Sequence, residues 1–229
     1  MKHIHHSSID STSLFLKNNF NKFIAEDQQI LVSTDKQTNG RGRSGHTWEH
    51  PLNCLTFSFT LKPCPILTLS SLELGVLLAQ FLKGKLYLKW PNDIINLEYK
   101  KCGGILCQVI DKEHLVIGIG INAGKFLSTD YQFDYPIGSV DSDLVLEKEE
   151  YKNLPLAIYQ YILDNRLRPL DIIKSWNTYC FHADKKVKIV DGNTSHEGIF
   201  KRIDKNGAAI LEINGEDKVI MCGSLFVIS

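Results

Sequence analysis

The stretch after residue 183 most limits how this chain can fold. Three asparagine–glycine or aspartate–glycine pairs lie there, at 191–192, 206–207 and 214–215. Such pairs favour the positive φ angles of tight hairpin turns. Short apolar segments accompany them: Val187–Ile189, Ile199–Ile203, Ala208–Ile213 and Val219–Met221. The pattern predicts a small β-barrel over 184–229, attached to a larger α/β body over 1–183.

The body contains both strands and helices. Residues 54–61 alternate apolar and polar side chains, which predicts a strand covered on one face. Ser70-Ser71-Leu72-Glu73 predicts a capping box that opens an apolar helix reaching Lys83 and buried against a sheet. Further strands are expected at 3–9, 30–32, 86–90, 104–110 and 115–121, and further helices after 10–12, over 148–165 and over 170–180.

Composition places the chain among ordinary globular proteins. Its 229 residues are 43% hydrophobic and 23% charged, which excludes disorder, collagen and coiled coil. The 26 basic and 26 acidic side chains balance, which argues against a dedicated nucleic-acid binder. No apolar run reaches the ~18–20 residues of a membrane span, and the polar N-terminus does not resemble a secretion signal. We therefore expect a cytoplasmic protein whose six cysteines are reduced.

The segment Gly40-Arg41-Gly42-Arg43-Ser44-Gly45 matches the G-x-G-x-x-G pattern. A dinucleotide-binding fold requires a helix directly afterwards, and the sequence from His46 to Pro51 is not helical in character. Neither a P-loop lysine nor the protein-kinase motifs are present. Glycine amides and arginine forks can still bind an anion closely. An exposed surface turn and a nucleic-acid-binding loop remain the alternatives.

Three further segments carry similar chemistry. Lys89-Trp90-Pro91-Asn92-Asp93 ends a predicted strand with a cation, an aromatic ring, an amide and a carboxylate. Lys101-Cys102-Gly103-Gly104 places a lysine before two glycines, and Gly118-Ile119-Gly120-Ile121-Asn122 is a glycine-spaced strand. Glycine within a strand indicates that something approaches the backbone closely. Together these segments predict one shared binding site.

These segments, in this order and spacing, resemble the biotin protein ligases. The glycine–arginine loop, Trp48, the Lys-Trp-Pro-Asn-Asp segment and the two glycine-containing strands carry the resemblance, and Asp10-Ser11-Thr12 fits the family's early motif. Ser13 stands where asparagine is usual, and His46 where a basic residue often follows the loop. The resemblance covers nearly the whole chain.

The resemblance implies an α+β fold. A central mixed β-sheet with helices, related to class II aminoacyl-tRNA synthetases, would carry the site, and the C-terminal strands would form an SH3-like barrel. The implied enzyme is of the monofunctional type, which lacks an N-terminal DNA-binding domain. It would use ATP and Mg²⁺ to activate biotin as biotinyl-5'-AMP, then transfer biotin to a lysine of a biotin carboxyl carrier protein, as in acetyl-CoA carboxylase. Exposed strand edges leave a homodimer open.

The resemblance also implies roles for individual residues. Lys101, Arg43 and Arg41 would be catalytic, because they would neutralise the biotin carboxylate, the α-phosphate and the adenylate. Biotin would contact Ser11, Thr12, Ser13, Gln37, Gly40, Arg41, Gly42, Arg43, Lys101, Gly103 and Gly104. ATP or the adenylate would contact Arg41, Arg43, Trp48, Asn92, Asp93, Lys101 and Asn122. Trp48 or Trp90 would wall the site, and Asp93 would orient Mg²⁺ or a catalytic cation.

Two other functions stay open at the level of sequence. A lipoate or octanoate protein ligase shares the implied catalytic fold but carries other motifs. A non-enzymatic regulator could bind nucleic acid through Arg41, Arg43 and the lysines near 185–188. Competition between biotin and lipoate for binding would distinguish a lipoate ligase from a biotin ligase. Salt-dependent binding to a duplex would support the nucleic-acid-binding regulator.

Overall fold

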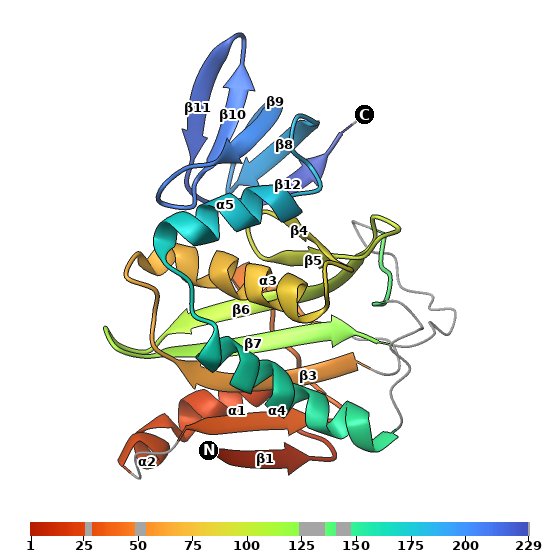
Figure 1. Ribbon diagram of the computed structural model, residues 1–229, viewed down its shortest axis with the longest axis vertical. Helices are drawn as coiled ribbons and strands as arrows, with labels where there is room; N and C mark the ends of the chain where they lie inside the picture. Colours follow the sequence, from red (N-terminus) through yellow and green to blue (C-terminus); the bar gives the residue numbers. More distant parts are fainter. Residues whose placement is uncertain (26–28, 49–53, 124–135, 141–147, 229) are drawn as a thin grey trace.

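The computed structural model describes residues 1–25, 29–48, 54–123, 136–140 and 148–228, and contains two β-sheets (Figure 1). The larger is a seven-stranded mixed sheet in the order β1-β2-β3-β7-β6-β5-β4, in which only β1 and β2 pair in parallel. Its strands are β1 (Lys2–His6), β2 (Ile30–Thr34), β3 (Cys54–Leu61), β4 (Tyr87–Lys89), β5 (Asp93–Ile95), β6 (Lys101–Val109) and β7 (Leu115–Asn122). The mixed sheet predicted for residues before 183 is confirmed.

The C-terminal strands form a separate antiparallel sheet of five strands in the order β11-β10-β9-β8-β12. They are β8 (Lys186–Asp191), β9 (Thr194–Ile203), β10 (Ala209–Ile213), β11 (Glu216–Ile220) and β12 (Ser224–Val227). Gly192, Gly207 and Gly215 all have positive φ, as the predicted hairpin turns require. The short strand β12 had not been predicted, and neither had β5 in the larger sheet.

Helices cover both faces of the larger sheet. The helices are α1 (Thr12–Asn18), α2 (Phe20–Ala25), α3 (Ser70–Phe81), α4 (Lys148–Asp164) and α5 (Pro169–Tyr179). Figure 1 shows α3 and α4 across one face and α5 between the two sheets, while α1 packs on the opposite face of β2, β3 and β7. No helix in the described ranges is long and apolar enough to cross a membrane.

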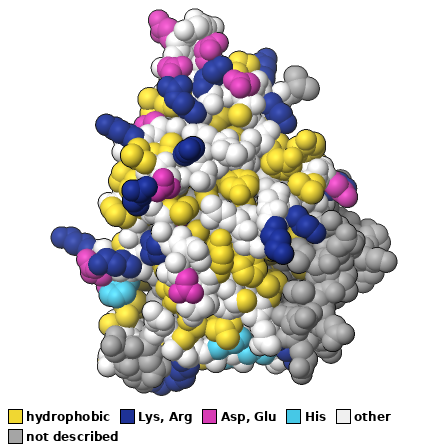
Figure 2. All heavy atoms as spheres, in the orientation of Figure 1, with side chains coloured by type: hydrophobic (Ala, Val, Ile, Leu, Met, Phe, Trp, Pro, Cys, Tyr) yellow, Lys and Arg dark blue, Asp and Glu magenta, His cyan; other side chains and the backbone are white. Residues whose placement is uncertain are grey.

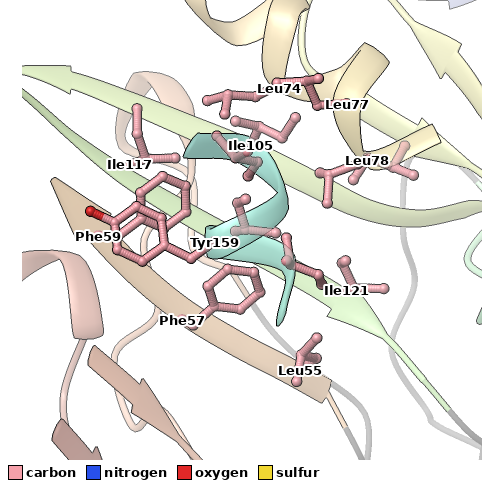
Figure 3. Close-up of a cluster of buried hydrophobic side chains, with 14 of the residues drawn as sticks. Leu55, Phe57, Phe59, Leu74, Leu77, Leu78, Ile105, Ile117, Ile121 and Tyr159 are labelled. Atoms are coloured by element: carbon pink, nitrogen blue, oxygen red, sulfur yellow. The ribbon is translucent and has the colours of Figure 1, made fainter. Parts of the chain in front are cut away.

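The main core lies between the sheet and helices α3 and α4 (Figure 3). Odd-numbered side chains of the central strands fill it, among them Phe57, Phe59 and Ile117, and Tyr159 of α4 stacks on Phe59. Because side chains alternate across a strand, the even-numbered residues of β3 and β7 face the α1 side. This alternation leaves that face available for the site described below.

Two local predictions in this region were wrong. The strand over 54–61 is buried on both faces, because α1 and the site cover its polar side as well. The capping box does not form. The Ser70 hydroxyl accepts a hydrogen bond from the Cys64 amide at 3.0 Å, and buried Glu73 pairs with Arg166 of the α4–α5 connection at 2.9 Å. Interactions with Cys64 and Arg166, both outside the helix, therefore replace the predicted capping hydrogen bonds.

Charges on the face shown in Figure 2 are interspersed, with acidic and basic side chains close to one another. This agrees with the balanced composition of the chain. The described cysteines are all free; Cys54, Cys64 and Cys102 are buried, and Cys222 is exposed. The prediction of unpaired thiols is thus confirmed.

Candidate functional site

A pocket opens on the α1 side of the larger sheet, over the middle of β3, β7, β6 and β5. Its floor follows the strand register: Ser58 of β3 pairs with Gly118 of β7, Gly120 pairs with Gly104 of β6, and Gly104 pairs with Asp93 of β5. Neighbouring strands are ~4.8 Å apart, so β3 and β5 lie ~14 Å from each other. The pocket therefore suits an elongated small molecule.

The β3 side of the pocket is polar but uncharged. The Gln37 side-chain oxygen accepts hydrogen bonds from the Thr12 amide at 2.8 Å and the Thr12 hydroxyl at 3.1 Å. That hydroxyl lies 2.8 Å from the Ser58 hydroxyl, and the hydroxyls of Ser11 and Ser13 are 3.1 Å apart. The Ser11 hydroxyl also caps α1, and it lies in the 10–12 segment after which the sequence predicted a helix. Buried uncharged donors and acceptors of this kind recognise a neutral polar ring without leaving a charge unpaired.

The β5 side of the pocket is charged. The Asp93 carboxylate contacts two ammonium groups, that of Lys89 at 2.7 Å and that of Lys101 at 2.6 Å. Burial alone would raise the pKa of Asp93, but the two lysines outweigh burial and hold its pKa below the usual value. Burial lowers the pKa of Lys89, and Asp93 opposes this effect. The arrangement keeps two cations and one anion together, with a net positive charge that suits an anionic substrate.

The glycine–arginine loop lies over the pocket as a narrow hairpin. The Gly42 amide donates to the His46 carbonyl at 2.7 Å, and the Trp48 amide donates to the Gly40 carbonyl at 2.9 Å. Arg43 donates to the Asn92 side-chain oxygen at 3.0 Å, while Arg41 lines the pocket from an exposed position. Asn92 in turn donates to the Ile105 carbonyl at 2.8 Å. The loop is thus tied to the segment between β4 and β5.

Trp48 explains the glycine at position 120 of β7. A Cβ atom on Gly120 would lie 2.6 Å from the Trp48 ring, which no real side chain permits, and one on Gly104 would lie 3.4 Å from it. The Lys101 ammonium lies 5.9 Å from the centre of the same ring. The predicted close approach at Gly120 is therefore the approach of an indole ring that forms part of the pocket wall.

The structure brings most of the predicted site residues to this pocket. Those that line it are Thr12, Ser13, Gln37, Arg41, Gly42, Arg43, Trp48, Asn92, Asp93, Lys101 and Gly104. Ser11, Gly40, Gly103 and Asn122 lie outside the lining. Asn122 is buried and donates to the Gly138 carbonyl at 3.1 Å. Trp90 lies at the pocket edge with its ring buried in a core, so the wall belongs to Trp48.

Several lining residues were not assigned to the site from the sequence. Thr56 and Ser58 form the polar side of β3, and their alternation with phenylalanines was the available signal. Lys89 was seen as a cation of its segment but not as a partner of Asp93. Ser224 and Leu225 come from β12, more than 100 residues away from the nearest other lining residue in sequence, and no local pattern marked them.

The site offers little to a divalent cation. Both Asp93 oxygens already contact lysines, and no cluster of three or more histidine, cysteine, aspartate or glutamate side chains occurs within the described ranges. Mg²⁺ in nucleotide sites needs only one or two carboxylates besides substrate phosphates, and it keeps several waters. Among the described residues that line the pocket Asp93 is the one carboxylate, and because both of its oxygens contact lysines it does not fit a resident Mg²⁺ site.

Comparisons with known proteins agree with this geometry. The model of the Biotin/lipoate A/B protein ligase family matches residues 6–122. The bifunctional ligase/repressor BirA of Salmonella typhimurium is 28% identical over 236 residues, which cover 95% of this chain and 71% of BirA. Biotin–protein ligase 1 of Arabidopsis thaliana is 36% identical over 104 residues, covering 39% of this chain and 28% of that protein.

Solved structures share the fold. The biotin protein ligase of Aquifex aeolicus in complex with biotin and ATP superposes with a TM-score of 0.78 and 23% identity, covering 99% of both chains. The biotin acetyl coenzyme A carboxylase synthetase of Helicobacter pylori has a TM-score of 0.67 and 21% identity, covering 95% of this chain and 98% of that one. The similarity includes the C-terminal sheet, since nearly all of this chain is matched.

Proposed function

The chain belongs to the Biotin/lipoate A/B protein ligase family, and we propose that it is an ATP-dependent biotin protein ligase. In the first half-reaction a biotin carboxylate oxygen attacks the α-phosphorus of ATP, which gives biotinyl-5'-AMP and pyrophosphate. In the second, a lysine amine of a biotin carboxyl carrier protein attacks the acyl carbon. An amide forms, the amine loses a proton and AMP leaves.

One observation carries this proposal: the pocket joins an uncharged hydrogen-bonding end to a cationic end. The ureido ring of biotin has neutral donors and acceptors, which suit Thr12, Ser13, Gln37 and Ser58. The biotin carboxylate would then reach Lys101 across the floor of β7. The dithiolane ring of lipoate has no such groups, so it would leave those buried polar side chains without partners.

The cationic end would do most of the catalysis. Two anions must approach each other in line, and Lys101, Arg43 and Arg41 would neutralise the charge that develops on the α-phosphate. We add Lys89 to this proposed group, because Asp93 holds its ammonium beside that of Lys101. Trp48 would wall the adenylate and help to exclude water from the acyl phosphate.

We assign Mg²⁺ to the ATP phosphates and not to a protein carboxylate, because Asp93 is occupied by its two lysines. Bound in this way, the ion would supply charge neutralisation at the phosphates. We place the enzyme in the cytoplasm, where ATP is present and its six free thiols stay reduced. A homodimer, the carrier protein and the roles of Ser11, Gly40, Gly103 and Asn122 stay predictions.

Biotin-dependent exchange of pyrophosphate into ATP tests the proposed function. Purified protein with Mg²⁺ is expected to exchange label with biotin and not with lipoate or octanoate. Exchange with lipoate alone would assign the chain to the other branch of the family. The absence of exchange with all three acids, by protein shown to be folded, would refute the adenylation chemistry.

A further inference from the structure

One turn of the C-terminal sheet, Asp204–Gly207 between β9 and β10, forms hydrogen bonds directly with the larger part of the molecule. Two consecutive carbonyls of this turn accept hydrogen bonds from side chains of the body. The Thr68 hydroxyl donates to the Asn206 carbonyl at 2.6 Å, and the Trp90 indole nitrogen donates to the Gly207 carbonyl at 3.0 Å. The turn therefore contacts the body at two adjacent, directional points.

The turn has the rigidity that such a joint needs. The Asp204 carboxylate accepts hydrogen bonds from the amides of Asn206 at 2.8 Å and Ala208 at 2.9 Å. Gly207 has a φ of +81°, and a Cβ atom there would lie 2.8 Å from the Leu72 side chain. Only glycine combines this φ with this close packing at low cost. The internal hydrogen bonds and packing of the turn thus hold the two carbonyls in position to accept from Trp90 and Thr68.

Trp90 connects this joint to the cationic end of the pocket. It directly follows Lys89, which pairs with Asp93, and it precedes Asn92, which accepts the hydrogen bond from Arg43. Its side chain is 1% exposed and packs in a core shared by α3, α5 and the C-terminal strands. Any movement of the Trp90 ring would therefore move the backbone that carries Lys89 and Asn92.

The strands on either side of this segment are short. β4 and β5 have three residues each, and β4 is the edge strand of the larger sheet. Short edge strands have few ladder hydrogen bonds and open readily. The anchor at Trp90 adds to the pairing of β5 with β6 and to the hydrogen bond from the Phe181 amide to the Leu88 carbonyl at 3.3 Å.

We infer that the Asp204–Gly207 turn is a positioning element of the catalytic site. It holds Trp90 by its indole N–H and thereby sets the places of Lys89, Asn92 and Asp93. Trp90 is a positioning residue, since it acts through its neighbours and its buried ring donates to the Gly207 carbonyl. The inference rests on the proposed function for its kinetic consequence, and on geometry alone for the restraint itself.

Two variants separate positioning from simple stabilisation. Trp90→Phe keeps an aromatic ring and removes the donor to Gly207, while Thr68→Val removes the donor to the adjacent Asn206 carbonyl. Each variant loses one hydrogen bond to the same turn, which should lower the melting temperature by about 2–4 °C in Thr68→Val. Trp90→Phe should lower it further, because the smaller ring also leaves a cavity in the core. Thr68 lies before α3 and is not connected to the Lys89–Asp93 segment, which makes Thr68→Val the matched control.

Pyrophosphate exchange gives the kinetic readout. Trp90→Phe should lower kcat by about tenfold or more, because small misplacements of catalytic groups are costly. Its KM for biotin should stay within about twofold of wild type, since the uncharged end of the pocket is built on α1 and β3. Thr68→Val should keep kcat within about twofold. Equal losses of kcat in both variants, or an unchanged kcat in Trp90→Phe, would overturn the inference.

Amide hydrogen exchange gives a readout that does not depend on the proposed function. Residues 88–95 should exchange faster in Trp90→Phe than in wild type, and at the wild-type rate in Thr68→Val. Unchanged protection of 88–95 in Trp90→Phe would refute the restraint. If the wild-type protein shows no biotin-dependent exchange, the proposed function fails, while the hydrogen-exchange comparison still decides the structural claim.

Discussion

Replacing Asp93 by asparagine removes the carboxylate that contacts both Lys89 and Lys101. The Lys89 side chain is 8% exposed and the Asp93 side chain 13%, so the variant leaves a buried ammonium without its counter-ion. Breaking a buried ion pair from one side typically costs about 3–5 kcal/mol. Lys101 is 29% exposed and can turn toward water, so we expect a loss near the lower end, about 3 kcal/mol at pH 7.

The loss should depend on pH in a defined direction. Burial already lowers the pKa of Lys89, and without Asp93 this pKa falls further, below the ~10.4 of an unfolded lysine. Between those two pKa values the unfolded chain binds a proton that the folded chain does not, so stability rises with pH. The deficit of Asp93→Asn should therefore shrink as the pH approaches about 10.

At acid pH the loss of stability comes from protonation of the Asp93 carboxylate. Because the pKa of Asp93 is lowered in the folded protein, its stabilising contribution is present above the unfolded value of about 3.9 and is lost as the pH falls through the folded value. Asp93→Asn should lack this part of the acid sensitivity.

Urea unfolding followed by tryptophan fluorescence at pH 7 and pH 9.5 measures the deficit at neutral pH and its decrease toward alkaline pH. Asp111→Asn, an exposed carboxylate in the β6–β7 turn, serves as the control and should unfold close to wild type at both pH values. A deficit of Asp93→Asn below about 0.5 kcal/mol at pH 7, or one that does not change with pH, would refute the idea that Asp93 holds the two cations.

Four further outcomes are expected. Lys101→Ala should lower the rate of adenylation by about 10²-fold or more, measured by pyrophosphate exchange, and unchanged turnover would remove it from the mechanism. Gly120→Ala should weaken biotin binding in calorimetry far more than Gly118→Ala, because a Cβ at 120 meets an indole ring at 2.6 Å and one at 118 makes ordinary contacts from 3.5 Å. Burial lowers the pKa of His182 to about 3, so its ¹⁵N NMR shifts should show a neutral ring at pH 5. Its folded pKa lies below the unfolded value of about 6.5, so it should contribute a loss of stability as the pH falls from 6.5 toward 3. Glu73→Gln should lower the free energy of unfolding by about 3 kcal/mol, read from the urea midpoint, since it removes the charge of a fully buried carboxylate whose partner Arg166 is 28% exposed.

The sequence determined the elements whose causes are local. The hairpin turns at Gly192, Gly207 and Gly215 follow from residues that tolerate positive φ. The helix cap at Ser11 and the strand over 54–61 follow from short-range chemistry and from alternation. The motif segments were also correctly expected to meet, because their glycines made sense only if something approached the strands closely.

Tertiary structure decided which groups became partners. Lys89, Asp93 and Lys101 lie on three different strands, and their contact depends on the register of β4, β5 and β6. Glu73 forms an ion pair with Arg166, some 90 residues away, and does not form the predicted capping box. The bidentate ion pair is stronger than a single capping hydrogen bond.

The contribution of the C-terminal sheet to the site was also invisible in the sequence. Ser224 and Leu225 reach the pocket, and the Gly207 carbonyl reaches Trp90, only through the way in which two sheets pack around α5. Hydrophobic periodicity predicts which face of a helix or strand is buried, but it does not predict which other element covers that face. Local sequence patterns therefore determined the helices, strands and turns of this ligase. Long-range packing determined which charged side chains contact one another.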